Sequence, residues 1–397
     1  MRTTVAIIFA IAIAIGTSSP VIAQETREAQ IAAEQAEKAK HLRPYEPSKA
    51  EQMFVRLTRG FIETPSGFYP SFGSVYGGGG FTLGAGYRRF YGDRALWDAR
   101  GLYSVRSYKL VELGTTSPGH AQGRLDLFAQ TGWRDATQVA FYGLGMTTVE
   151  AARTNFRMEQ ATVSAGLRAR PIPWTVASFA VAYEDFTITN GTGTKPPVQL
   201  VYTPATAPGL GGNPKYLHSA ATAGIDWRPS EGYARRGGLY EIGYHNYTDL
   251  DDAYSFDRLD GEIVQHIPIL RENWVVSLRG RVQTTLDDKD VVPYFLLPAL
   301  GSGSTLRGYG SWRFRDRHSE LFSVEWRWIP SRFALDMAIF YDAGKVTSRR
   351  SDLGFDGLKG NVGIGARFHG PAATPLRIEL ARGQEGLNLV FSGGPAF

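Results

Sequence analysis

The sequence predicts an all-β protein: a single transmembrane antiparallel β-barrel of about 16 strands, with a short N-terminal periplasmic segment. Three observations lead to this fold class. Many short segments alternate polar and apolar residues with a period of two. The composition is rich in glycine and aromatic residues, with 46 glycines and 12% aromatics in 397 residues. Short and long connections also alternate along the chain, as they do in outer-membrane barrels.

Residues 1–23 are predicted to be a secretory signal peptide. Arg2 supplies a positive charge, Val5 to Ile15 form an apolar core, and small or apolar residues precede a predicted cleavage at Gln24. The alternative is a membrane anchor, but the apolar core is too short to span a bilayer. Residues 24–67 follow as a helical or flexible periplasmic lead-in, because their first half is rich in helix formers and has no apolar face.

Residues 68–397 are predicted to form the barrel. In one typical segment, Val276 and Leu278 alternate with Ser277 and Arg279, so the two sets lie on opposite faces of a sheet. About sixteen such segments can be distinguished by this alternation. They are residues 68–77, 80–91, 95–108, 121–133, 137–146, 155–170, 174–189, 216–228, 237–248, 256–268, 273–285, 318–329, 333–343, 360–368, 375–382 and 386–397.

A soluble β-sandwich is the main alternative to a barrel, since it also alternates polar and apolar residues. Two features favour the barrel. The polar face carries both signs of charge in dense groups, such as Arg258, Asp260 and Glu262 on one segment, as expected for a lumen. The apolar face is rich in aromatic residues near segment ends, as expected for the two interfacial girdles.

The connections predict the orientation of the barrel. If Phe68 starts upward from the periplasm, the short periplasmic turns fall near Gly92, Arg134, Pro171, Pro229, Leu270, Pro330 and Gly370. The outer loops then include the longer connections Val111–His120, Asn190–Lys215, Asp287–Arg317 and Gly344–Lys359, with short exceptions at Gly77–Gly80 and Gly383–Glu385.

The most informative stretch is Gly301-Ser-Gly-Ser-Thr-Leu-Arg-Gly-Tyr-Gly310. Its glycines allow backbone conformations that other residues avoid, and Arg307 stands alone in an uncharged run. A lone loop arginine is normally solvated. We expect this one to point into the barrel, where the alternation places Glu325 on the inner face of its strand. Phe333 and its alternate neighbours on the next strand are expected to face lipid, which places Asp336 and Asp342 inside as well.

The C-terminal portion resembles the BamA/TamA (bacterial surface antigen) superfamily of outer-membrane barrels. The resemblance rests on several pieces in order: Leu306-Arg307-Gly308-Tyr309, Val324-Glu-Trp-Arg-Trp-Ile-Pro330, Ile339-Phe-Tyr-Asp-Ala-Gly-Lys-Val346, Gly363-Ile-Gly-Ala-Arg-Phe368, Leu376-Arg-Ile-Glu-Leu-Ala381 and an aromatic C-terminus. Phe141-Tyr-Gly-Leu-Gly145 also looks like the family.

The resemblance implies a specific pairing and a function. The loop motif Leu306, Arg307, Gly308 and Tyr309 would fold into the lumen, where the arginine pairs with acids on two strands, here Glu325 and Asp342. The implied function is to assist insertion, assembly or translocation of macromolecules at the outer membrane. Members that insert or secrete proteins carry periplasmic POTRA domains, and residues 24–67 are too short for one. A separate periplasmic protein is therefore an expected partner, beside outer-membrane lipid.

The sequence contains no clear catalytic, cofactor or metal constellation, so we do not expect an enzyme or a bound cofactor. There is no cysteine, and no Gly-x-Ser-x-Gly elbow. His245 shares a face with Glu241, and His266 with Glu262, but such pairs fall short of the three or four ligands of a metal site. The net charge of +5 has no basic block typical of nucleic-acid binding. Two alternatives stay open: a passive channel or transporter for small solutes, and a lipid enzyme of the outer membrane.

Overall fold

The computed structural model describes residues 32–34, 37, 66–92, 94–270, 273–287, 291–328, 335–370 and 374–397. Sixteen strands form one antiparallel sheet in which each strand pairs with the next one along the chain, except that β11 pairs directly with β14. All of them belong to one compact unit. The predicted signal peptide and most of the lead-in lie outside the described residues.

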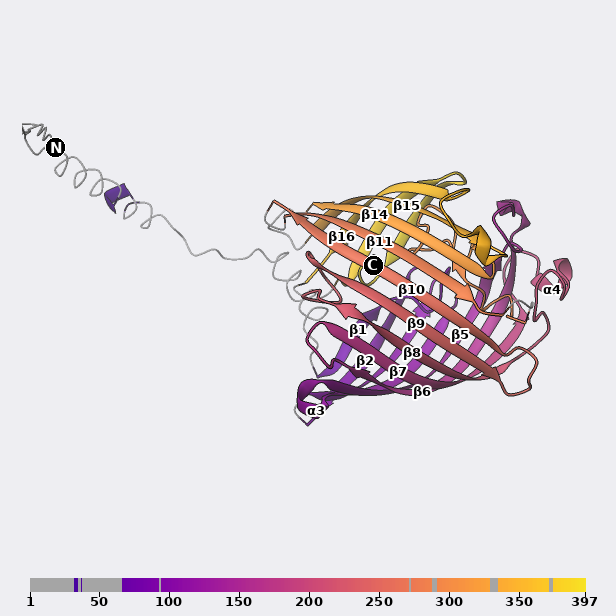
Figure 1. Cartoon of the computed structure of the whole chain (residues 1–397), viewed down its shortest axis with the longest axis horizontal. Coiled ribbons are helices and arrows are strands. Elements are labelled where there is room, and N and C mark those ends of the chain that lie inside the picture. Colours follow the sequence, from indigo (N-terminus) through magenta and orange to yellow (C-terminus); the bar gives the residue numbers. More distant parts are fainter. Residues whose placement is uncertain are drawn as a thin grey trace, which may run out of the picture. The chain divides into compact units, whose positions relative to one another are not determined.

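The strands of the large sheet have the following bounds: β1 (Gly67–Phe72), β2 (Thr82–Tyr91), β3 (Ala95–Ser104), β4 (Lys109–Gly119), β5 (Leu125–Phe141), β6 (Thr154–Ala169), β7 (Thr175–Asn190), β8 (Lys215–Asp226), β9 (Gly237–Asp249), β10 (Phe256–Ile269), β11 (Trp274–Thr285), β14 (His318–Trp328), β15 (Leu335–Thr347), β16 (Lys359–Phe368), β17 (Leu376–Gly383) and β18 (Gly386–Ser392). In Figure 1 these strands run side by side at a common tilt and curve around an interior. A second, two-stranded sheet pairs β12 (Ala299–Leu300) with β13 (Phe314–Arg315).

The predicted number of strands is correct, but two of the predicted strands are wrong. The outer loop expected at Val111–His120 is almost entirely strand, because β4 runs from Lys109 to Gly119. The turn expected near Arg134 does not exist, because β5 runs through it. Arg134 and Asp135 resemble turn residues in the sequence but lie within this strand, where the Asp135 side chain is fully buried and pairs with Arg157. One strand was missed and another was counted as two, so the two errors cancel. The other predicted turns therefore lie at the ends of the barrel where they were expected.

The turn between β3 and β4 explains why β4 was missed. Ser107 has a positive φ of 63°, a conformation that usually calls for glycine, so no glycine marks this turn in the sequence. The Ser104 hydroxyl stabilises the turn by accepting a hydrogen bond of 3.0 Å from the backbone N–H of Tyr108. The real turn after β4 contains the short helix α3 (His120–Gly123).

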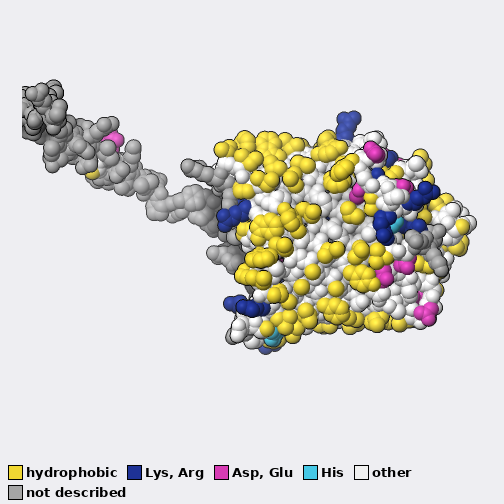
Figure 2. Space-filling view, in the orientation of Figure 1, with side chains coloured by type: hydrophobic (Ala, Val, Ile, Leu, Met, Phe, Trp, Pro, Cys, Tyr) yellow, Lys and Arg dark blue, Asp and Glu magenta, His cyan; other side chains and the backbone are white. Residues whose placement is uncertain are grey.

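The two faces of the sheet follow the predicted alternation. On β14, Val324 and Trp326 are exposed on the outside, whereas Glu325 between them is buried. On β11, Leu278 is exposed and Ser277 is buried. Figure 2 shows hydrophobic side chains spread over the outside of the strands, with charged side chains gathered toward the two ends. This is the distribution expected of a barrel whose outer surface contacts lipid.

The two ends of the sheet are the strands β1 and β18. Both are described throughout, and no ladder pairing joins these two strands. Unpaired backbone groups at a strand edge are costly in lipid, at several kcal/mol each, so this seam is the weakest part of the wall. Within the described ranges, no helix has the length and apolar character needed to cross a membrane.

Candidate functional site: the loop inside the barrel

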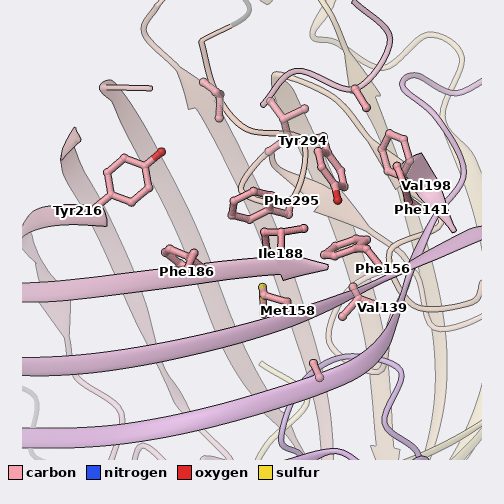
Figure 3. Packing of buried hydrophobic residues seen from close by; sticks show 14 of the residues in the cluster. Val139, Phe141, Phe156, Met158, Phe186, Ile188, Val198, Tyr216, Tyr294 and Phe295 are labelled. Carbon is pink, nitrogen blue, oxygen red and sulfur yellow. The ribbon is translucent and has the colours of Figure 1, made fainter. Parts of the chain in front are cut away.

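The connection between β11 and β14 comprises residues 286–317, and its described residues from 291 onward fold back into the barrel. We call it the β11–β14 loop. Its first part contributes Tyr294 and Phe295 to a buried hydrophobic cluster with inward-facing residues of the wall, including Phe141, Phe156 and Phe186. Figure 3 shows these rings in mutual contact, and Tyr294 is 5.0 Å from both Phe141 and Phe156 between ring centroids. The cluster lies at the end of the barrel that carries the long loops.

The motif Leu306 to Tyr309 lies deeper inside, against the wall formed by β16 and β17. Leu306 and Tyr309 are buried in a second apolar cluster. Between them, Gly308 makes a close approach: a Cβ atom there would lie 2.5 Å from the Cβ of Asn361 and 2.8 Å from the backbone nitrogen of Gly383. Any larger residue would push the loop away from the wall, so the glycine sets the depth of the motif.

Arg307 lies among three carboxylates and is almost completely buried. Its Nε and Nη2 atoms donate to the two carboxylate oxygens of Asp342 at 2.9 and 2.8 Å, a bidentate pair. Its Nη1 atom donates to Glu325 at 3.1 Å and to Glu379 at 3.0 Å. The guanidinium carbon is 3.3 Å from the centroid of the Phe340 ring. The structure thus brings the loop arginine together with both Glu325 and Asp342.

Three further residues of this site were not singled out in the sequence. Arg367 pairs with both Glu325 and Glu379, and Arg377 donates to Glu379 at 2.8 Å. Alternation had placed Arg377 and Glu379 on the polar face of their strand, but it does not tell which strands meet across the lumen. With Arg307, Glu325 and Asp342, these residues form a compact group that we call the lumen ion cluster.

The charges of this cluster act strongly on Arg307. Burial by itself would lower the pKa of the guanidinium, but the hydrogen bond and charge of Asp342 outweigh this, with Glu325 and Glu379 adding to the effect. The net result is a pKa raised above the ordinary value of arginine. The surrounding carboxylates therefore hold Arg307 in its charged form.

The β11–β14 loop also contacts the chain on both sides of the seam. On the β18 side, Asn388 donates to the backbone oxygens of Arg307 and Tyr309 at 2.8 and 3.2 Å. On the β1 side, Trp312 donates to the backbone oxygen of Gly77 at 2.9 Å, and its ring stacks on Tyr76. A cavity of about 510 Å³ lies between these two groups of contacts and is lined by parts of both.

The remaining candidate residues have structural partners. His245 Nδ1 lies 3.1 Å from His218 Nε2, and His218 Nδ1 lies 3.0 Å from a carboxylate oxygen of Glu184. His266 Nδ1 lies 2.8 Å from the Ser277 hydroxyl. In the part of the chain that the structure describes, no three His, Cys, Asp or Glu side chains are grouped so that they could hold a metal ion. These histidines are wall residues of the lumen.

Comparison with known proteins decides the family. Residues 124–397, more than half of the chain, match the Omp85 superfamily domain. The chain belongs to the Omp85 superfamily. The matched residues include strands β5 to β18 and the β11–β14 loop. The sequence has no significant match among curated proteins.

Several solved structures resemble this Omp85 chain. BamA from Haemophilus ducreyi lacking POTRA domains 1-3 aligns with a TM-score of 0.58 at 15% identity, covering 82% of this chain and 69% of that one. CdiB from Escherichia coli aligns with a TM-score of 0.56 at 11% identity, covering 82% and 61%. CdiB from Acinetobacter baumannii aligns with a TM-score of 0.50 at 11% identity, covering 83% and 57%. At these identities the likeness concerns the fold.

Proposed function

We propose that this Omp85 barrel helps to insert, assemble or translocate macromolecules at the outer membrane, and that its resting lumen is closed. The observation that carries the proposal is the position of the β11–β14 loop. It lies inside the lumen and contacts both sides of a seam that strand pairing leaves open. A wall with one unpaired seam and an internal loop beside it can change shape there without breaking the other strand pairs.

The buried aromatic cluster argues against a passive channel for small solutes. Tyr294 and Phe295 of the loop pack on Phe141, Phe156 and Phe186 of the wall, and all five side chains are almost completely buried. A hydrated solute would lose its water when it entered such packing, at a cost of several kcal/mol for each unsatisfied polar group. Below the cluster the lumen widens into a polar cavity of about 460 Å³. The aromatic cluster therefore obstructs the lumen at the end with the long loops.

The experiment that tests the proposal uses the purified full chain in lipid vesicles. A second outer-membrane barrel protein is added from urea, and its folding is followed by its shift in electrophoretic mobility. We expect vesicles that contain the Omp85 chain to accelerate this folding over empty vesicles. The same protein in planar bilayers should show low resting conductance, because the aromatic cluster closes the lumen.

A matched control separates a specific effect from simple disturbance of the bilayer. Vesicles with the same amount of an unrelated barrel of similar size should give no acceleration. The proposal fails if the Omp85 chain accelerates folding no more than this control, and steady ohmic conductance at rest would support the channel instead.

A further inference from the structure

The connection between β8 and β9, residues 227–236, is the longest of the fully described connections at the short-turn end, and it folds inward. We call it the β8–β9 segment. Its residues Tyr233 and Ala234 are buried, although outer-membrane barrels usually place such turns in periplasmic water. A turn that buries a tyrosine and its neighbour has a partner surface, and the contacts identify that surface.

Tyr233 binds residues on the far C-terminal strands. Its hydroxyl donates to Asp336 Oδ2 at 2.8 Å, across 103 positions of sequence. Its ring stacks on His369 with centroids 4.0 Å apart and planes 5° apart, and His369 Nε2 lies 3.1 Å from Asp336 Oδ1. Next to it, Thr374 donates to the backbone oxygen of Gly232 at 3.0 Å. Asp336 has no exposed surface, so the tyrosine hydroxyl bonds to a fully desolvated carboxylate.

The same segment is held on the opposite side by β6. Arg168 and Arg170 both pair with Glu231, at 2.7 and 2.6 Å. In strand order β6 and β16 lie half the sheet apart, which in a barrel places them on opposite walls. The β8–β9 segment therefore crosses the mouth of the lumen from one wall to the other.

Arg327 connects this segment to the lumen ion cluster. Its Nη2 atom donates to the backbone oxygen of Ala234, and its Nε atom lies 3.9 Å from Glu325, which in turn pairs with Arg307. Glu325 thus lies beside both Arg307 and Arg327, and Arg327 in turn binds the β8–β9 segment. Removing Arg307 would take one of the cations from Glu325, which would then attract Arg327 more strongly and weaken its bond to Ala234.

We propose that the β8–β9 segment is a gate across the periplasmic mouth of the lumen, closed by Tyr233 on Asp336 and His369. We propose further that its closure is coupled to Arg307 through Glu325 and Arg327. This inference goes beyond the proposed function, because it concerns access to the lumen whatever the client is.

The absence of cysteine from the sequence permits a direct test. Ala234→Cys introduces a single thiol at the buried position, and its modification by a maleimide reports how often the segment opens. In the otherwise unchanged chain we expect slow labelling. Adding Tyr233→Phe keeps the stacked ring but removes a hydrogen bond to a charged acceptor, so labelling should become about tenfold faster. Arg307→Ala should also accelerate labelling if the coupling exists.

Tyr69→Phe is the matched control, because the Tyr69 hydroxyl also donates to an aspartate of the wall, Asp98, at 2.6 Å. It should leave the labelling of Cys at position 234 unchanged. Folding of each variant is verified by its heat-dependent mobility on a gel. Fast labelling of the Ala234→Cys chain, or equal labelling with and without Tyr233→Phe, overturns the proposal of a gate. Acceleration by Tyr233→Phe but none by Arg307→Ala overturns the coupling. Neither result depends on whether the barrel accelerates folding of a client.

Discussion

Replacing Arg307 tests the centre of the site. In Arg307→Ala, Asp342 loses both side-chain hydrogen bonds from the arginine and keeps that of Asn361, at 2.9 Å, and the longer one from the backbone N–H of residue 307, at 3.4 Å. Asp342 has no exposed surface, so its charge would be left buried without a cationic partner. Breaking a buried pair in this way costs ~3–5 kcal/mol. We expect the free energy of unfolding to fall by that amount in a urea titration in detergent or lipid.

The second-site variants identify which carboxylate carries the cost. Glu325 and Glu379 retain Arg367 when Arg307 is removed, whereas Asp342 has no comparable substitute. Asp342→Asn should therefore restore more stability to Arg307→Ala than Glu325→Gln does. Arg307→Lys should give an intermediate loss, since an ammonium cannot reproduce the bidentate bond.

A loop that leaves the wall also becomes accessible to protease. Arg313 and Arg315 of the β11–β14 loop are each only 1% exposed, so trypsin should cut after them slowly in the parent and faster in Arg307→Ala. The exposed Arg349 supplies a control, because its replacement by alanine should cost less than ~1 kcal/mol and leave the loop protected. The reasoning is refuted if Arg307→Ala behaves like this control in both measurements.

Three other expectations concern the wall, the outer loops and the aromatic cluster. An epitope inserted between β7 and β8, in residues 191–214, should be labelled on intact cells, and labelling only after permeabilisation would reverse the orientation. Leu278→Arg on the lipid face should destabilise the barrel by ~2–4 kcal/mol in a urea titration, and Gln283→Arg on the lumen face of the same strand by much less. Equal losses would contradict the face assignment. Phe295→Ala should cost ~3–5 kcal/mol and raise the resting conductance, whereas unchanged conductance would mean that the cluster does not close the lumen.

The repetitive part of the fold was predictable from the sequence. Period-two alternation assigned the faces of β11 and β14 correctly, because each outward position meets lipid and each inward one meets the lumen. It failed at β4 and β5, where local chemistry was misleading. Ser107 makes a turn without glycine, and Arg134 and Asp135, which look like turn residues, continue a strand in which Arg134 bonds to Gln160 and Asp135 pairs with Arg157.

The candidate site was only partly predictable for a different reason. The inward direction of Glu325 and Asp342 follows from alternation, and their link to Arg307 was an expectation from the family resemblance. Nothing in the sequence connects Arg367 and Glu379 to the same arginine, since they meet only when several strands curve around the loop. Likewise, the hydrogen bond from Tyr233 to Asp336 joins residues 103 positions apart in the sequence and has no local signal.

The lumen ion cluster has a more specific role than stability. Well-packed apolar residues often stabilise a protein as much as a buried ion group does. An apolar contact, however, tolerates sliding, whereas the bidentate bond of Arg307 to Asp342 forms at one depth and one angle. Gly308 enforces the same depth by its close approach to Asn361 and Gly383. The cluster therefore fixes the β11–β14 loop at one position beside the seam, and any movement of the loop would have to break several charged bonds together.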